Sequence, residues 1–140
     1  MTTGHCNCSA VQVEVPLETL PLVICSCTSC RASSGSLFTV NLIVPSSAFT
    51  LLKGEENLGK YEDKKTDSGG TAIRYWCKTC GSPVYTVFSA DSNTFYVKGG
   101  LFPPKSLPKP VGEIFTRNFE EWQIKHVEEG KCAEGGPGGA

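Results

Sequence analysis

Cys-Ser-Cys-Thr-Ser-Cys, residues 25–30, is the stretch around which the rest of this sequence is organised. It places three thiols directly after the short apolar run 22–24. We expect that run to be a β-strand, so that the thiols lie where a strand gives way to a loop. Three thiolates fill three corners of the tetrahedron that zinc prefers in proteins. The stretch therefore predicts a zinc site with an open fourth corner.

Two further cysteine pairs lie far from this trio and far from each other. They are Cys6-Asn-Cys8 near the N-terminus and Cys77-Lys-Thr-Cys80, which is followed by Gly81. Both have the close spacing of zinc ligands, and Gly81 suits a tight turn after the second ligand. One ion shared by both pairs would join the first strand to the middle of a sheet. Structural zinc binds peptides with about 10 to 16 kcal/mol, so we expect folding to depend on this site.

Three other uses of the cysteines stay open. Cys27 and Cys30 could share an ion with Cys77 and Cys80, although zinc ribbons usually have roughly 15 to 20 residues between their pairs. Cys132 or another group could close the trio and make it purely structural. A disulfide framework is the third alternative, because eight cysteines suit a secreted protein. The N-terminus has no apolar signal stretch, however, which favours metal binding.

Composition and charge favour a small β-domain in a reducing compartment. The chain has 140 residues with Gly 15 and Pro 9, and its Val, Ile, Phe and Tyr residues fall in short runs, as in strands. The formal net charge of -1 argues against nucleic-acid partners. No segment approaches the roughly 20 apolar residues of a membrane span. We therefore expect a cytoplasmic protein with neither nucleic-acid nor membrane partners; a homo-oligomer is compatible with the sequence.

We expect one domain over residues 1–128, followed by a flexible Gly-rich tail over 129–140. The domain should be mainly β, with antiparallel sheets stapled by zinc and short helical turns. Residues 62–70 should form an exposed loop, residues 32–35 a tight turn, and residues 119–127 one or two helical turns with Asn118 as N-cap. The expected strands cover residues 11–15, 22–24, 37–44, 49–52, 58–61, 73–76, 84–88, 94–98 and 113–116.

The open corner over the trio favours sulfur chemistry. Three thiolates give a zinc site a net charge of about −1, which weakens the ion as a Lewis acid. Activation of water is therefore disfavoured, whereas zinc keeps a bound thiol deprotonated at neutral pH. The predicted partner of Cys25, Cys27 and Cys30 is a small-molecule thiol or thiol adduct, for example one of glutathione.

The sequence resembles the glutathione-dependent formaldehyde-activating enzyme family, which includes the centromere protein V domain. The resemblance runs from Gly4 to about Trp122. It rests on Gly-His-Cys-Asn-Cys at 4–8, on the trio followed by Arg31 and Gly35, and on Cys-Lys-Thr-Cys-Gly at 77–81 after an aromatic residue. The resemblance implies a mainly antiparallel β fold and two zinc ions per chain. It places a catalytic zinc on the trio and a structural zinc on the two outer pairs, Cys6, Cys8, Cys77 and Cys80.

The activity assigned to members of this family is the addition of glutathione to formaldehyde. The resemblance therefore implies a zinc-dependent carbon-sulfur lyase that acts on a glutathione adduct of formaldehyde or a related small electrophile. Ser26 and Glu113 stand where the family often has histidine. Glu113 is our candidate for a general base, the alternative being a solvated acid at the end of a strand. Arg31 is our candidate to pair with a carboxylate of glutathione, the alternative being that it balances the thiolate charge.

Two further functions remain as alternatives. The missing histidines leave room for a glutathione-independent zinc lyase or isomerase that acts on another small metabolite. By resemblance to the centromere protein V domain, the chain could also be a non-catalytic zinc-binding interaction module. Binding to duplex DNA is disfavoured because the sequence has no stripe of lysine and arginine.

Overall fold

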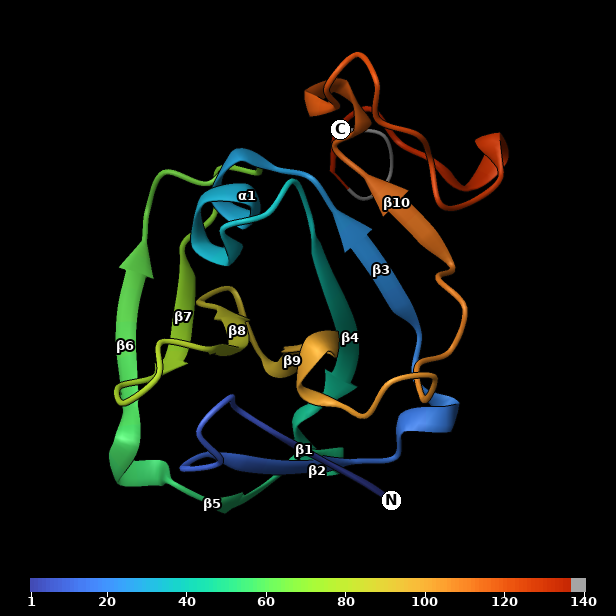
Figure 1. Cartoon of the computed structure of the whole chain (residues 1–140). Coiled ribbons are helices and arrows are strands. Elements are labelled where there is room, and N and C mark those ends of the chain that lie inside the picture. The colour runs from blue at the N-terminus through green and yellow to red at the C-terminus, as the bar shows by residue number, and fades with distance from the viewer. Residues whose placement is uncertain (137–140) are drawn as a thin grey trace.

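The computed structural model describes residues 1–136 and is built mainly from strands in two sheets (Figure 1). The smaller sheet is antiparallel and has the order β1-β2-β5. The larger sheet has seven strands in the order β10-β3-β4-β9-β8-β7-β6. The strands are β1 Thr2–His5, β2 Gln12–Val15, β3 Leu22–Cys25, β4 Thr39–Pro45, β5 Thr50–Lys53, β6 Leu58–Asp63, β7 Ala72–Cys77, β8 Pro83–Phe88, β9 Asp91–Lys98 and β10 Gly112–Ile114.

The predicted mainly β fold class is confirmed, with two differences in detail. β10 pairs with β3 in parallel, whereas the other pairs of the larger sheet are antiparallel. The chain also forms β1, which the sequence pattern did not predict, because this strand becomes a strand only by pairing with β2. Short 3-10 turns connect strands at Leu17–Thr19, Ser46–Ala48, Glu55–Asn57 and Gly99–Leu101, and two more follow β10 at Thr116–Asn118 and Glu129–Lys131.

One α-helix, α1 over Thr28–Ser34, lies in the part of the chain that the structure describes. The side chain of Cys27 caps it by accepting the N–H of Cys30, and Gly35 ends it with a φ of 67°. A left-handed residue at this position is the usual end of a helix, and glycine adopts it without steric cost. The prediction of a tight turn over 32–35 is therefore wrong, because those residues continue a helix that starts within the cysteine trio.

The two faces of the larger sheet differ. Leu42, Val44 and Val97 point to one side and form a single apolar cluster with Val13 and Val15 of β2. These residues are almost completely buried, and they hold the smaller sheet against the larger one. Along β4 and β9, polar residues alternate with these core residues and point to the other side. Figure 1 shows that the larger sheet curves around α1. The apolar face thus supplies the core, and the opposite face is available for a site.

The segment after β10 differs from its prediction. Residues 119–127 form turns instead of helix, so the helical prediction is wrong there. Asn118 does not cap a helix, because its Nδ2 donates to the carbonyl oxygen of Ser26 at 3.1 Å.

The predicted tail lies partly against β10. The N–H of Ala133 donates to the carbonyl oxygen of Glu113 at 2.9 Å, and that of Phe115 to Gly135 at 2.9 Å. Residues 137–140 lie outside the described residues, and the domain boundary at 128 stays a prediction. Within residues 1–136, no helix combines the length and the apolar character needed to cross a membrane.

Candidate metal centres and the adjoining cavity

The two outer cysteine pairs meet in space. Cys6 and Cys8 lie after β1, while Cys77 ends β7 and Cys80 lies in the turn before β8. Their four Sγ atoms lie within 4.8 Å of one another. The Sγ atoms of Cys6 and Cys8, and of Cys8 and Cys77, are 3.7 Å apart. Tetrahedral zinc-sulfur bonds of about 2.3 Å separate the sulfurs by about 3.8 Å. This four-cysteine cluster therefore has room for zinc, and it joins the smaller sheet to the larger one.

Neighbouring donors favour thiolates in the four-cysteine cluster. Asn57 donates from Nδ2 to the Sγ of Cys77 at 3.2 Å, and the Oγ of Ser82 lies 3.2 Å from the Sγ of Cys80. Hydrogen bonds from Ser82 lower the pKa of Cys80 to about 5. Gly81 has a φ of 79°, so its predicted role in the turn is confirmed. Four sulfurs in a closed tetrahedral arrangement suit a structural metal ion.

The cysteines of residues 25–30 form a second cluster. Cys25 ends β3, Cys27 caps α1, and Cys30 lies in the first turn of α1. Their Sγ atoms lie within 4.8 Å of one another. Each residue is at most 7% exposed, and the N–H of Cys30 donates to the Sγ of Cys27 at 3.2 Å. The helical turn brings Cys27 and Cys30 together, because residues three apart lie on one side of a helix.

The rival groupings of the cysteines do not form. Cys27 and Cys30 belong to one cluster and Cys77 and Cys80 to the other, so the zinc-ribbon alternative is wrong. Cys132 lies beside β10 and belongs to neither cluster. All eight cysteines have free thiols. Among residues 1–136, no fourth cysteine, histidine, aspartate or glutamate joins the three-cysteine cluster.

The three thiols of this cluster influence one another's ionisation. Hydrogen bonds with Cys25 and Cys27 lower the pKa of Cys30, and the charge of Lys98 and a contact with Thr39 lower it further. The hydrogen bonds with Cys27 and Cys30 raise the pKa of Cys25. One proton therefore leaves easily, and the next leaves against the repulsion of neighbouring thiolates. A bound cation removes that repulsion, so the cluster fits a metal ion.

A buried lysine supplies positive charge near the three-cysteine cluster. Lys98, at the end of β9, is 8% exposed. Its Nζ donates to the Oδ1 of Asn41 at 2.8 Å, and Asn41 donates from Nδ2 to the Oγ1 of Thr39 at 3.1 Å. Burial lowers the pKa of Lys98, whereas the charges of the cysteines act in the opposite direction. The hydrogen bonds hold the ammonium group in place inside the protein.

A cavity of about 280 Å³ lies beside the three-cysteine cluster, and Cys25, Cys27 and Cys30 contribute to its wall. The sheet register explains which other residues line it, because alternate side chains of a strand point to opposite faces.

Two rows of paired residues cross the sheet on this face. Val23 of β3 pairs with Asn41 of β4, which pairs with Lys98 of β9. Tyr96 pairs with Thr86 of β8. All five side chains line the cavity, although their strands are far apart in the sequence.

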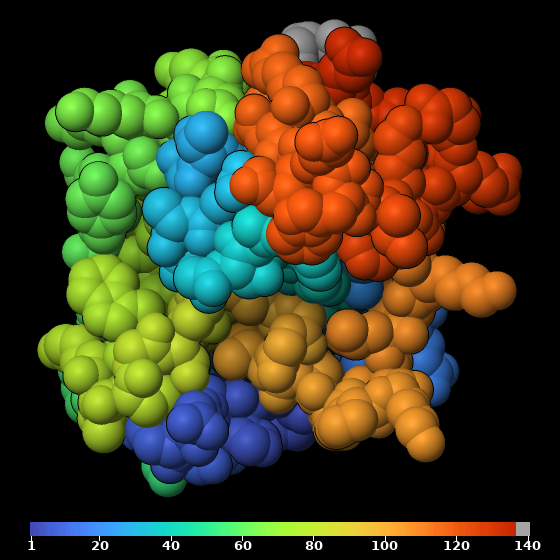
Figure 2. All heavy atoms as spheres, turned by 45° about the horizontal axis from the view of Figure 1, so that its top comes forward, coloured from blue at the N-terminus to red at the C-terminus, as the bar shows by residue number. Residues whose placement is uncertain are grey.

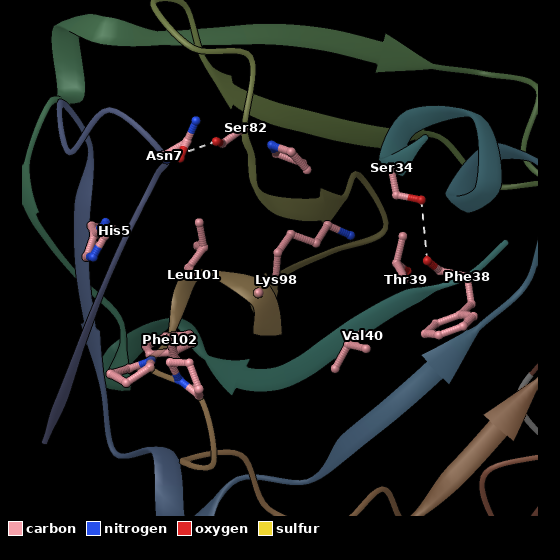
Figure 3. Close-up of a pocket in the computed structure, with 14 residues that line it drawn as sticks. His5, Asn7, Ser34, Phe38, Thr39, Val40, Ser82, Lys98, Leu101 and Phe102 are labelled. Carbon is pink, nitrogen blue, oxygen red and sulfur yellow. Dashed lines mark hydrogen bonds between the residues drawn. The ribbon is translucent and has the colours of Figure 1, made fainter. Parts of the chain in front are cut away.

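Lys98 also lines a second, larger cavity of about 510 Å³. Figure 3 shows its side chain reaching from β9 toward Ser34 and Thr39, with Leu101 and Val40 on either side. No cysteine lines this cavity. We place the functional site at the smaller cavity, because it alone combines the three-cysteine cluster with a buried cation.

Glu113 does not face the smaller cavity. Its side chain is completely buried, and its Oε1 accepts the N–H of His126 at 2.7 Å while its Oε2 lies 2.9 Å from the Nδ1 of His126. Its neighbours Gly112 and Ile114 line the cavity instead, because successive residues of a strand alternate. Both expectations for Glu113, a base at the trio and a solvated acid, are corrected. It is a buried acid that holds the C-terminal segment.

Arg31 also points elsewhere. Its Nη1 donates to the carbonyl oxygen of Asn118 at 3.1 Å, and its Nη2 lies 3.7 Å from Glu120. These contacts join α1 to the segment after β10. Figure 2 shows the two segments, light blue to cyan and orange to red, next to each other on the surface. The arginine that lines the cavity is Arg74 of β7, whose Nε donates to Asp63 at 3.0 Å. Arg31 thus lacks the geometry expected of a residue that binds the substrate.

The sequence pattern did not single out Lys98, Asn41, Thr86 or Arg74. The only available signal was that each is a polar residue next to apolar residues of the same strand. Such residues usually mark the solvated face of a sheet. Here they line a cavity, because α1 and the segment after β10 lie over this face.

The comparisons with known proteins give consistent results. A Schizosaccharomyces pombe protein named as an uncharacterized lyase is 28% identical over 99 residues, which cover 71% of this chain and 66% of that protein. An Emericella nidulans protein, named provisionally as a glutathione-dependent formaldehyde-activating enzyme, is 31% identical over 58% of this chain and 40% of its own length. The match thus spans less than two thirds of each of these relatives.

A crystal structure of a Rhodobacter sphaeroides protein shares the fold, with a TM-score of 0.57, at 23% identity over 73% of this chain and 88% of that one. The model of the family described as glutathione-dependent formaldehyde-activating enzyme matches residues 1–118. That range contains both cysteine clusters and every strand described above. The chain therefore belongs to the glutathione-dependent formaldehyde-activating enzyme family.

Proposed function

We propose that this protein is a zinc-dependent carbon-sulfur lyase that makes or breaks the bond between the sulfur of glutathione and the carbon of a small carbonyl electrophile. One observation carries the proposal: three buried cysteine sulfurs, with no fourth protein ligand among residues 1–136, border a cavity that also contains a buried cation. The names of the family and of the relatives support lyase chemistry on glutathione.

Cys25, Cys27 and Cys30 would hold the catalytic zinc, and Cys6, Cys8, Cys77 and Cys80 the structural zinc. Bound at the trio, zinc would keep an incoming thiol ionised at neutral pH and close to its partner. The trio supplies three donors, and tetrahedral coordination leaves one position for a substrate sulfur.

The proposed reaction is the addition of a thiolate to a carbonyl group. The sulfur of glutathione attacks the carbonyl carbon, a carbon-sulfur bond forms, and the π electrons of the carbonyl move to its oxygen. The oxygen then takes a proton from solvent, which balances the proton lost by the thiol. The product is a hemithioacetal, and the reverse reaction releases thiol and carbonyl compound. Neither direction needs an oxidant or reductant.

We assign stabilisation of the developing oxyanion to Lys98 and Thr86, which line the same cavity as the trio. Lys98 provides a fixed ammonium group in a site shielded from water, where charge is stabilised strongly. The Oγ1 of Thr86 is buried and makes no hydrogen bond to any residue of the described structure. A buried hydroxyl without a partner is costly, and a substrate oxygen would provide that partner. Glu113 is not needed for this reaction.

The proposed location is the cytoplasm. The gathering of seven cysteines into two clusters that could hold metal ions supports it, because a reducing compartment keeps thiols available for zinc.

The Cys27→Ser variant tests the role of the trio. Serine is a good helix N-cap, so the variant should keep α1 and the fold. Its zinc content should fall from about two ions to about one, and it should lose the ability to form the glutathione adduct of formaldehyde. Cys132→Ser, which changes a cysteine outside both clusters, should keep both zinc ions and full activity. Undiminished activity of a folded Cys27→Ser variant would remove the trio from the mechanism.

A further inference from the structure

We propose that the electrophile used at this site carries an apolar substituent, of the size of a phenyl or branched alkyl group. This inference rests on the proposed function and makes its substrate more specific. It follows from the walls of the cavity beside the three-cysteine cluster, which are mainly apolar. Val23, Ile43, Phe88, Val111 and Phe115 contribute to them.

The apolar walls come from several separate elements. Val23 lies on β3, Ile43 on β4 and Phe88 on β8, and each lies on the face of the sheet that carries the trio. Val111 precedes β10 and lines the cavity, although it is 53% exposed. An apolar surface assembled from four distant segments forms a shaped pocket, of the kind that binds apolar ligand groups.

Two aromatic rings form one wall. Phe88 and Tyr96 lie edge to face, with ring centroids 5.3 Å apart and planes at 89°. This arrangement is favourable for aromatic pairs, so the two rings support each other. They present a fixed apolar surface to whatever occupies the cavity.

Phe115 forms part of the apolar surface next to the sulfurs. It is 4% exposed and packs in one cluster with Cys25, Cys27 and Cys30. Its backbone has a φ of 58°, a conformation that residues with a side chain rarely adopt. Strained backbone of this kind is concentrated at functional sites, where the surrounding structure holds it. Here it keeps an aromatic ring beside the place where the carbon-sulfur bond would form.

The polar residues that line the cavity fall into a buried group and an exposed group. Lys98, Asn41 and Thr86 are nearly completely buried, whereas Asp67 and Ser68 are exposed. The cavity therefore has a polar inner end, apolar walls and an exposed polar rim. The inner end suits the carbonyl oxygen of the electrophile, and the rim suits the peptide part of glutathione. A substituent on the carbonyl carbon would occupy the space between the walls.

Formaldehyde has no such substituent and would leave these walls uncovered. Each methylene group transferred from water to an apolar surface strengthens binding by about fourfold. A phenyl group that fills the cavity should therefore strengthen binding by at least about tenfold. Adducts of apolar aldehydes should be preferred over the adduct of formaldehyde.

Stable thioethers of glutathione test the inference without any turnover. We suggest measuring the dissociation constants of S-methylglutathione and S-benzylglutathione for the zinc-loaded protein by isothermal titration calorimetry. S-Benzylglutathione should bind at least about tenfold more tightly. Equal affinity for the two ligands would overturn the inference.

The Phe88→Ala variant locates the effect in the cavity. It should reduce the ratio of the two affinities by at least about fivefold, because it removes one aromatic wall. Leu52→Ala is the matched control: Leu52 is 47% exposed on β5 and does not line the cavity, so the ratio should not change. A ratio that Phe88→Ala leaves unchanged would place the apolar contact elsewhere and overturn the inference.

The inference and the proposed function fail in different ways. Tight binding of S-benzylglutathione with no turnover of any glutathione adduct would overturn the proposed function and uphold the apolar pocket. Turnover of the formaldehyde adduct together with equal affinity for the two thioethers would uphold the function and overturn the pocket.

Discussion

The four-cysteine and three-cysteine clusters use the same side chain in different surroundings. The four-cysteine cluster lies where the two sheets meet, and its Cys8 is exposed. The three-cysteine cluster is buried beside a cavity, near the ammonium group of Lys98. A complete set of four protein donors leaves no position for a substrate, whereas three donors leave one. The two clusters share their donor type, so the number of donors and the surroundings set them apart.

The clusters also differ in what they hold together. Cys6 and Cys8 are about seventy positions from Cys77 and Cys80, and their cluster joins two sheets. The three-cysteine cluster is contained in residues 25–30, where β3 turns into α1. Loss of the first cluster should therefore affect the whole fold, and loss of the second should affect mainly the site.

The largest expected effect is the difference between Cys77→Ser and Cys25→Ser. Cys77→Ser removes a ligand from a site whose metal contributes up to about 10 to 16 kcal/mol in model peptides, so the variant should not fold. Cys25→Ser should fold and lose at least about 100-fold in adduct turnover. Thermal unfolding followed by circular dichroism, together with zinc analysis, checks both. A folded Cys77→Ser variant would show that the closed cluster is not the structural one.

The next largest effect concerns Lys98, the buried cation beside the three-cysteine cluster. Lys98→Met keeps an unbranched side chain of similar length and removes its charge, so kcat should fall by about 100-fold with a smaller change in KM. Zinc content should stay at about two, because Lys98 is not a ligand. Lys109→Met, which changes an exposed lysine, serves as the control. Unchanged kcat in Lys98→Met would exclude Lys98 from stabilising the oxyanion.

The smallest expected effect concerns the loop that supports α1. Asp67 accepts the N–H and the hydroxyl of Thr28 at 2.9 and 2.8 Å, at the start of the helix. Asp67→Ala should lower the free energy of unfolding by about 1 kcal/mol, as loss of a helix cap does. It should weaken zinc binding at the three-cysteine cluster and not at the four-cysteine cluster. Competitive zinc titration and urea denaturation at pH 7 measure both changes.

The effect of Asp67 should depend on pH in a defined direction. The hydrogen bonds from Thr28 lower the pKa of Asp67 in the folded protein. Its contribution is therefore complete above the pKa of an unfolded carboxyl group, about 3.9, and is lost as the pH falls through the lower folded pKa. The difference in stability between wild type and Asp67→Ala should shrink over that range.

The two cysteine clusters were predictable from the sequence because closely spaced cysteines have few roles in proteins and their spacing is informative. The spacings in residues 6–8, 25–30 and 77–80 favoured the grouping that the structure has, and the structure then excluded the zinc-ribbon grouping that the sequence left open. The mainly β class followed from short apolar runs separated by glycine and proline. Both inferences depend on local chemistry, which a sequence displays directly.

The direction of individual side chains was less predictable. Glu113 and Arg31 lie next to residues of the site, yet both point away from the cavity toward the segment after β10. In a strand, a shift of one position turns a side chain to the other face. The sequence does not specify which face of the sheet meets α1, so closeness to the site along the chain did not predict which side chains point into the cavity.

The clusters of cysteines, the β class and the absence of a basic stripe could all be read from the order of residues, because each depends on residue type and short-range spacing. The polar inner end and the apolar walls of the cavity could not. They form because strand order places Lys98 beside Asn41 and Tyr96 beside Thr86. The start of α1 also brings Cys27 and Cys30 together next to Cys25 at the end of β3. Such long-range pairing depends on the apolar surface that the whole chain buries when the two sheets pack, and no single segment of the sequence specifies it.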